Sequence, residues 1–274
     1  MKRRDFLTVG SAGLAALATT ATASAQNREG LFARLRANVT REPRQFTEVR
    51  KYTVANAEKR AQFVEILDNA LIPALNRQGL RPVGVFVPLP REESSANNVF
   101  VVIPHRTPDT FINATARLLI DRVFMRDAAP IFETTSQDPV YTDCDTSFLL
   151  GFESVPTLEI PVTGPDRIFE WRIYRSFNIE RNEAKIKMFD EGGQMPLFRE
   201  TGLNPVFFGN VLAGPRTPAL MFIVGCPSAE AHTEAWQAFR THPKWLVMRD
   251  LPEFADTATE IERVVLTPSP GSQI

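Results

Sequence analysis

Residues 169–175 read Phe-Glu-Trp-Arg-Ile-Tyr-Arg, and apolar and polar residues alternate along 169–174. Such alternation predicts a β-strand, because successive side chains of a strand point to opposite faces of the sheet. The two faces carry Phe169, Trp171 and Ile173 on one side, and Glu170, Arg172 and Tyr174 on the other. An acid, a base and a phenol on one strand face need polar partners, so this face is the first candidate site.

The same polar pattern occurs 122 positions earlier, at Glu48, Arg50 and Tyr52. Further identities keep this spacing, and after an inserted residue they continue at a spacing of 123. The matched pairs include Asn56 with Asn178, Asp68 with Asp190, Pro73 with Pro196, Pro104 with Pro227, Arg117 with Arg240, and residues 125–127 with 248–250. A spacing held over a whole segment indicates a tandem duplication of about 120 residues, which is too long for a solenoid repeat.

Each copy contains the same order of predicted elements. After the first strand, apolar residues recur every three or four positions between Phe63 and Leu75, which predicts a helix. Two strands, a second helix and a last strand follow, with the strands over 83–89, 98–104 and 147–152 in the first copy and 206–212, 219–226 and 261–266 in the second. The order is βαββαβ, so we predict an α+β protein with two ferredoxin-like units.

The first 25 residues have the features of an export signal and are excluded from the fold. Basic residues 2–4 precede an Ala-rich stretch, and residues 23–25, Ala-Ser-Ala, form a small-x-small cleavage site. Arg3-Arg4 followed by Phe6-Leu7 resembles a twin-arginine signal, with an ordinary secretory signal as the alternative. We expect cleavage near Ala25 and a periplasmic location.

The remaining chain divides at the limits of the two copies. The predicted segments are a helix and linker over 26–45, unit 1 over 46–152, a linker over 153–167, unit 2 over 168–267 and a flexible tail over 268–274. Loss of the signal changes the formal net charge from −1 to −3, so no basic excess favours nucleic acid. No membrane span is expected after signal removal.

Cysteine and histidine are too few for a recognisable metal motif. Two cysteines and three histidines lie far apart, and their spacing fits no zinc pattern. The periplasm permits a disulfide between Cys144 and Cys226, but their spacing leaves its formation open. We expect no metal site.

The chain resembles the NIPSNAP family. The resemblance lies in the Glu-x-Arg-x-Tyr strand that opens a ferredoxin-like unit, in the tandem duplication, and in Trp236-x-x-Phe239-Arg240 on the second helix of unit 2. It implies the dimeric α/β-barrel fold, in which the sheets of two ferredoxin-like units pair face to face. Two arrangements stay open: both halves of one barrel come from this chain, or each unit pairs with a second chain in a homodimer.

The barrel provides a place for the polar strand face. We expect the helices to cover Phe169, Trp171 and Ile173, and we expect both Glu-x-Arg-x-Tyr sets to line the barrel interior. Asn210, on the second strand of unit 2, is expected to reach the same interior. The polar set is then either a self-satisfied structural network or a pocket for a small organic ligand.

Three functional hypotheses follow. The first is a NIPSNAP-like protein that binds a small organic ligand or a protein partner in the barrel interior or at its rim, without a cofactor. The second is a cofactor-free monooxygenase or isomerase, because related barrel enzymes hold activated substrates with aromatic and amide residues. In this chain Trp236 and Asn210 are the candidates for those roles. The third is a haem protein with His232 or His242 as axial ligand, as in other relatives of the barrel group.

Overall fold

The computed structural model describes residues 44–274, so the predicted signal peptide and most of the segment that follows it lie outside the described residues. Unit 1 contains β1 (Phe46–Thr53), α2 (Ala57–Ile66), the π-helical η1 (Leu67–Leu71), α3 (Ile72–Arg77), β2 (Gly84–Pro88), η2 (Glu93–Ser95), β3 (Asn98–His105), α4 (Pro108–Ile120), α5 (Arg122–Asp127), α6 (Ala129–Phe132) and β4 (Asp143–Gly151). The predicted βαββαβ order is confirmed.

Unit 2 repeats this order. It contains β5 (Ile168–Arg175), α7 (Ile179–Asp190), α8 (Gln194–Glu200), β6 (Asn204–Ala213), β7 (Ala219–Cys226), α9 (Ala229–Thr241), α10 (Pro243–Met248), η3 (Pro252–Phe254) and β8 (Glu260–Pro268). Asn56 and Asn178 are equivalent residues, and each is the N-cap of the first helix of its unit. The Asn56 side chain accepts from Lys59 N, and the Asn178 side chain accepts from Arg181 N. These matching N-caps anchor the alignment of the two units at a spacing of 122.

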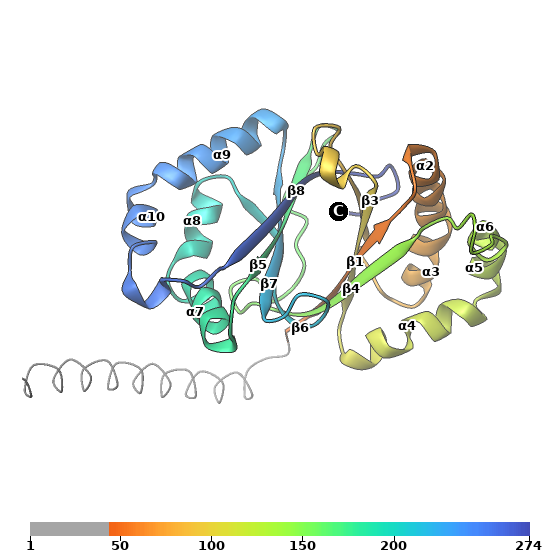
Figure 1. Cartoon of the computed structure of the whole chain (residues 1–274), viewed down its shortest axis with the longest axis horizontal. Helices are drawn as coiled ribbons and strands as arrows, with labels where there is room; N and C mark the ends of the chain where they lie inside the picture. Colours follow the sequence, from red (N-terminus) through yellow and green to blue (C-terminus); the bar gives the residue numbers. More distant parts are fainter. Residues whose placement is uncertain (1–43) are drawn as a thin grey trace, which may run out of the picture. The chain divides into compact units, whose positions relative to one another are not determined.

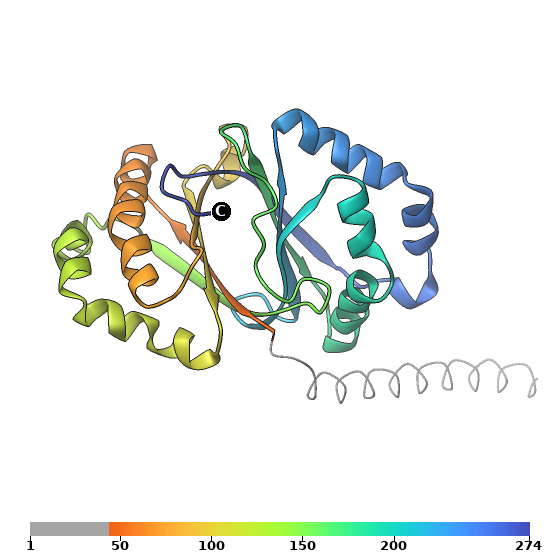
Figure 2. The same ribbon diagram turned by 180° about the vertical axis from the view of Figure 1, so that it is seen from behind.

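The eight strands form one closed barrel in the order β1-β3-β2-β8-β5-β7-β6-β4. Unit 1 supplies β4-β1-β3-β2 and unit 2 supplies β8-β5-β7-β6, so the halves join where β2 pairs with β8 and β4 pairs with β6. The helices of the two units lie on opposite sides of the barrel (Figures 1 and 2). A single chain therefore completes the barrel, which settles the question that the sequence left open.

The two faces of β5 are oriented opposite to our expectation. Phe169, Trp171 and Ile173 point into the barrel, where they pack against unit 1 residues such as Phe86 and Phe100. Two sheets that meet face to face exclude water, so the apolar faces of both units go inside. The Glu-x-Arg-x-Tyr sets consequently lie on the helix-covered face of the sheet and do not line the barrel interior.

The predicted flexible tail is instead bound to unit 1. Ser269 N donates to Val85 O at 2.8 Å and Gln273 N donates to Val83 O at 3.0 Å, which extends the pairing along β2. Ile274 is 1% exposed and belongs to the apolar cluster of the barrel interior. The chain end therefore lies among the strands (Figure 1).

Two equivalent aspartates hold the chain where it leaves the last strand of the opposite unit. Asp68 in η1 of unit 1 accepts from Ser269 Oγ at 2.6 Å and from Gly271 N at 3.0 Å, after β8. Asp190 at the end of α7 in unit 2 accepts from Ser154 N at 3.1 Å, and also from Ser154 Oγ, after β4. We call these contacts the reciprocal clamps, because each unit holds the segment that follows the other.

Both cysteines are free, and Cys226 is buried. They lie in different units, Cys144 on β4 and Cys226 on β7. In the described part of the chain, no helix is both long and apolar enough to cross a membrane.

Candidate functional site

The two polar strand sets form matching hydrogen-bonded networks. On β5, Arg172 Nε donates to Glu170 Oε1 at 2.9 Å and Arg172 Nη1 donates to Tyr174 OH at 3.1 Å. On β1, Arg50 donates in the same way to Glu48 and, at 3.3 Å, to Tyr52 OH. The acid and the base of each network are therefore paired, as the structural interpretation of the sequence expected.

Each network also contains a histidine, and the two histidines come from different elements. His105 at the end of β3 places Nε2 2.9 Å from Glu48 Oε2, and His232 on α9 places Nε2 2.7 Å from Glu170 Oε2. The repeat aligns His105 with Ser228, not with His232. The two histidines therefore reach equivalent glutamates from positions that the repeat does not align. A comparison of aligned residues cannot detect this shared contact.

The carboxylates of both networks are ionised. Burial raises the pKa of Glu170, but the hydrogen bond from His232 and the charge of Arg172 outweigh it, so the pKa of Glu170 lies below its ordinary value. Since an ionised carboxylate only accepts, His232 Nε2 carries the proton of the 2.7 Å bond. Trp236 Nε1, 3.1 Å from the same His232 Nε2, is then a close contact and not a second hydrogen bond.

Trp236 closes the network of unit 2 on the helix side. It follows His232 by one helical turn on α9, so both side chains lie on the same face of the helix. The guanidinium carbon of Arg172 lies 3.7 Å from the ring centroid of Trp236, which is a cation–π contact. Glu170, Tyr174 and Trp236 thus surround Arg172.

A groove of about 400 Å³ opens next to this network. We call it the arginine groove; its lining residues are Arg91, Glu92, His232, Thr233, Trp236, Arg240, Arg263 and Val265. The first two follow β2 of unit 1, and the others belong to α9 and β8 of unit 2. It lies outside the barrel and combines three guanidinium groups with one carboxylate.

A phenylalanine of unit 1 occupies the position equivalent to one wall of the groove. Val265 pairs with Glu170 across the sheet, and Phe148 pairs with Glu48 in the same register. Phe148 stacks on Phe111 with centroids 4.3 Å apart, so it occupies the space that the smaller Val265 leaves open. Similarly, Arg263 is the equivalent of Thr146, and the repeat aligns Trp236 with Asn113.

Two predicted site residues lie elsewhere. Asn210 does not reach the barrel interior, because its Oδ1 accepts from Asn182 Nδ2 of α7 at 3.0 Å on the helix-covered face. His242 is the N-cap of α10, where its Nδ1 accepts from Lys244 N at 3.2 Å and its Nε2 lies 3.4 Å from Glu200 Oε1. These positions follow from local capping and helix packing.

Both candidate haem ligands are engaged in contacts within the protein. His232 is 7% exposed and directs Nε2 to Glu170, and both ring nitrogens of His242 have partners. Coordination of iron through these engaged nitrogens would break the contacts that hold the imidazoles. Among residues 44–274, no cluster of three or more metal-ligating side chains is found.

Apolar side chains of both units pack in the barrel interior, where a ligand was expected. A cavity of about 20 Å³ lies beside Trp171 and Lys51 at one end of the barrel, which suffices for about one water molecule. Lys51 also lies 3.6 Å from Glu262 in an ion pair at this end. The ligand-sized space next to the polar network is therefore the arginine groove.

Comparisons with known proteins agree with the barrel fold and leave the function open. No family model matches the chain, and no curated protein matches it. A protein from Lactobacillus acidophilus NCFM, provisionally named a monooxygenase, is 12% identical with a TM-score of 0.55, over 82% of this chain and 94% of that one. An anthrone oxidase-like protein is 13% identical with a TM-score of 0.52, over 83% and 92% of the two chains.

A NIPSNAP family protein of unknown function from Agrobacterium tumefaciens is also similar. It is 19% identical with a TM-score of 0.34, over 40% of this chain and 94% of that one. The shared feature established by the comparisons is thus the dimeric α/β-barrel type of fold.

Proposed function

We propose that the protein binds a small organic anion in the arginine groove. The observation that carries this proposal is the lining: Arg91, Arg240 and Arg263 face one volume of about 400 Å³ with Glu92 as the acid among the lining residues. Arginine forks recognise carboxylates and phosphates by paired hydrogen bonds, and cavities of this size hold small organic ligands.

The charges of the groove are poorly balanced by the protein itself. Within residues 44–274, Arg240 and Arg263 form no ion pair, and Arg91 Nε lies 4.0 Å from Glu92 Oε1. Glu170 is already shared between Arg172 and His232. A bound anion would complete the charge balance, and the apolar wall formed by Val265 and the edge of Trp236 favours an anion with an aromatic or aliphatic body.

The test is a calorimetric titration with benzoate, salicylate and inorganic phosphate, with benzyl alcohol as the uncharged control. Val265→Phe installs the unit 1 residue and fills the groove, and Arg263→Thr installs the unit 1 residue at the second equivalent position. Both variants should weaken anion binding at least tenfold. Arg249→Thr, which changes an exposed arginine paired with Asp250, should not. Equal binding by all variants would refute the site.

A cofactor-free isomerase or monooxygenase is the second proposal, and the His232–Glu170 contact favours it. A histidine oriented by an ionised carboxylate at the edge of a ligand-sized groove is a suitable general base. We expect such an enzyme to remove a proton from an acidic phenol or hydroquinone-type substrate held by the arginines. The test is solvent-deuterium exchange and oxygen uptake with a phenol panel; His232→Gln should abolish both while anion binding persists.

Export through the twin-arginine route is a separate proposal, based on residues 3–7 and the small-x-small site at 23–25. Cell fractionation and N-terminal sequencing of the full-length protein test it. Replacement of Arg3 and Arg4 by lysine should retain the protein in the cytoplasm, whereas continued export would indicate the general secretory route. If no small anion binds, the next hypothesis to test is a protein partner at the groove rim.

A further inference from the structure

Lys185 is a buried amine without a counter-ion. It lies on α7, is 8% exposed, and its Nζ has Met188 Sδ as its hydrogen-bonding neighbour at 3.3 Å. Three aromatic rings surround Nζ at 5.5–6.0 Å from their centroids, namely Tyr174, Phe189 and Trp245. Within the described chain no carboxylate forms an ion pair with Lys185, and a thioether is only a weak acceptor.

The fold does not require a lysine at this position. The repeat aligns Lys185 with Phe63 of α2, at the spacing that also aligns the Asn56 and Asn178 caps. Phe63 packs edge-on against Tyr52 with centroids 4.9 Å apart, as Lys185 lies over Tyr174. Unit 1 thus fills the site with an aromatic ring, whereas unit 2 places an ammonium group there at a desolvation cost. A costly group in a position that an apolar residue can fill is a candidate for chemistry.

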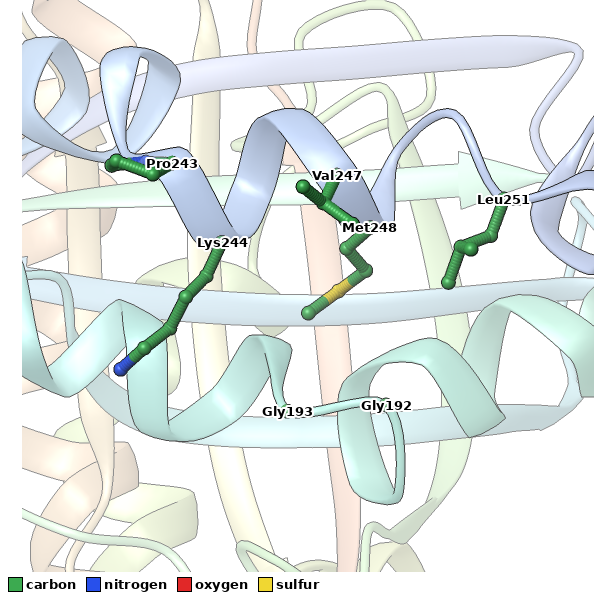
Figure 3. Close-up of a pocket in the computed structure, with 7 residues that line it drawn as sticks. All are labelled: Gly192, Gly193, Pro243, Lys244, Val247, Met248 and Leu251. Carbon is green, nitrogen blue, oxygen red and sulfur yellow. The ribbon is translucent and has the colours of Figure 1, made fainter.

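A largely apolar pocket of about 520 Å³ includes Met248 in its lining, and Met248 belongs to the same cluster as Met188, the hydrogen-bonding neighbour of this amine. It is bounded by α10 and by the turn between α7 and α8, where Gly192 and Gly193 leave the wall free of side chains (Figure 3). Met248 extends from α10 toward this turn (Figure 3) and belongs to one apolar cluster with Met188. Two flexible methionine side chains therefore separate the pocket from Lys185 Nζ.

Burial makes the amine a better nucleophile than an exposed lysine. Desolvation lowers the pKa of Lys185 to about 8, so about one amine in ten is uncharged at pH 7, far more than for an exposed lysine. A lysine desolvated in an apolar site is one established way to activate an amine for attack on a carbonyl group.

We propose that Lys185 forms an imine with a small, uncharged aldehyde or ketone that enters through the apolar pocket. The lone pair of the neutral Nζ attacks the carbonyl carbon, and both hydrogens of the amine pass to the carbonyl oxygen. The C–O bond breaks as the C=N bond forms, and the oxygen leaves as water. Apolar lining by Val247, Met248 and Leu251 favours an uncharged body over a keto acid. This site is separate from the arginine groove, so the two proposals stand or fall independently.

The experiment is reductive trapping on the intact protein. The protein is incubated with benzaldehyde and cyanoborohydride, and the modified lysines are identified by peptide mass spectrometry. We expect Lys185 to be modified at least tenfold faster than Lys187, which is exposed on the same helix. Modification of Lys187 and other exposed lysines with Lys185 unmodified would overturn the proposal.

Two variants separate reactivity from access. Lys185→Phe installs the residue that unit 1 uses and should remove the fast modification while the rest of the map is unchanged. Val247→Trp changes a side chain that is 67% exposed at the pocket and should slow modification of Lys185 at least fivefold without affecting Lys187. An unchanged rate in Val247→Trp would refute entry through this pocket.

Discussion

Removal of the Arg172 side chain is the sharpest test of the buried network. Arg172 donates to Glu170 Oε1 through Nε at 2.9 Å, pairs with it through Nη2 at 2.8 Å, and lies on the ring of Trp236. In Arg172→Ala the fully buried Glu170 keeps only His232 as a partner. Loss of one member of a buried ion pair costs about 3–5 kcal/mol, since the remaining charge is uncompensated.

The pH dependence of this loss has a definite sign. The pKa of Glu170 is lowered in the folded protein, so its contribution to stability is present above the unfolded pKa and is lost as the pH falls through the folded pKa. Arg172→Ala removes one of the causes of the lowered pKa of Glu170. The difference in unfolding free energy between wild type and variant should therefore be largest at neutral pH and should narrow in acid, where Glu170 becomes protonated.

Urea unfolding, followed by tryptophan fluorescence at neutral and acidic pH, measures this difference. Arg175→Ala is the matched control, because Arg175 is on the same strand, is 50% exposed and has only a 3.6 Å ion pair with Glu260. Its loss should cost less than about 1 kcal/mol. If Arg172→Ala were no more destabilising than Arg175→Ala, the network would be solvated and the account of its burial wrong.

Three further predictions rest on other contacts. Burial lowers the pKa of Lys185 from 10.5 to about 8. The unfolding free energy of the wild type should therefore rise by up to about 3 kcal/mol as the pH increases from about 8 to 10.5, and Lys185→Phe should flatten that rise in denaturant titrations. Asp190→Asn and Asp68→Asn should each cost about 1–3 kcal/mol in thermal unfolding by weakening one reciprocal clamp, and equal stability to wild type would contradict the clamps. In thiol titration, the partly exposed Cys144 should react in the native protein and the buried Cys226 only after unfolding; a single slow phase for both would argue against this arrangement.

Local patterns predicted the secondary structure because their causes are local. Strand alternation at β5 and the apolar spacing of α2 each depend on residues close in sequence. The repeat extended these predictions from one unit to the other.

The orientation of the strands could not be predicted in the same way. A period of two separates Trp171 from Arg172 but does not say which of them lies inside the barrel. We placed the charged set inside, and the closed barrel reversed the assignment because the apolar faces of both units pack together in the interior. The deep burial of Glu170 is possible since His232, from a helix that is distant in sequence, supplies the missing hydrogen bond.

The arginine groove was missed for a related reason. Arg91 comes from unit 1, whereas Arg240 and Arg263 come from unit 2, and it is the β2–β8 junction of the folded barrel that brings these arginines to one groove. The informative signal in the sequence was a difference between the aligned copies, Lys185 against Phe63. The difference between Val265 and Phe148 becomes visible only from the strand register of the folded barrel.

The sequence by itself thus determined the duplication, the βαββαβ order and the pairing of each acid with its neighbouring arginine, because these depend on short-range spacing. The tertiary structure alone decided the closure of one barrel within the chain, the inward direction of the apolar faces, the histidine partners and the position of the groove. These features depend on contacts between residues that are distant in sequence, whose free energy is gained only when the two units meet.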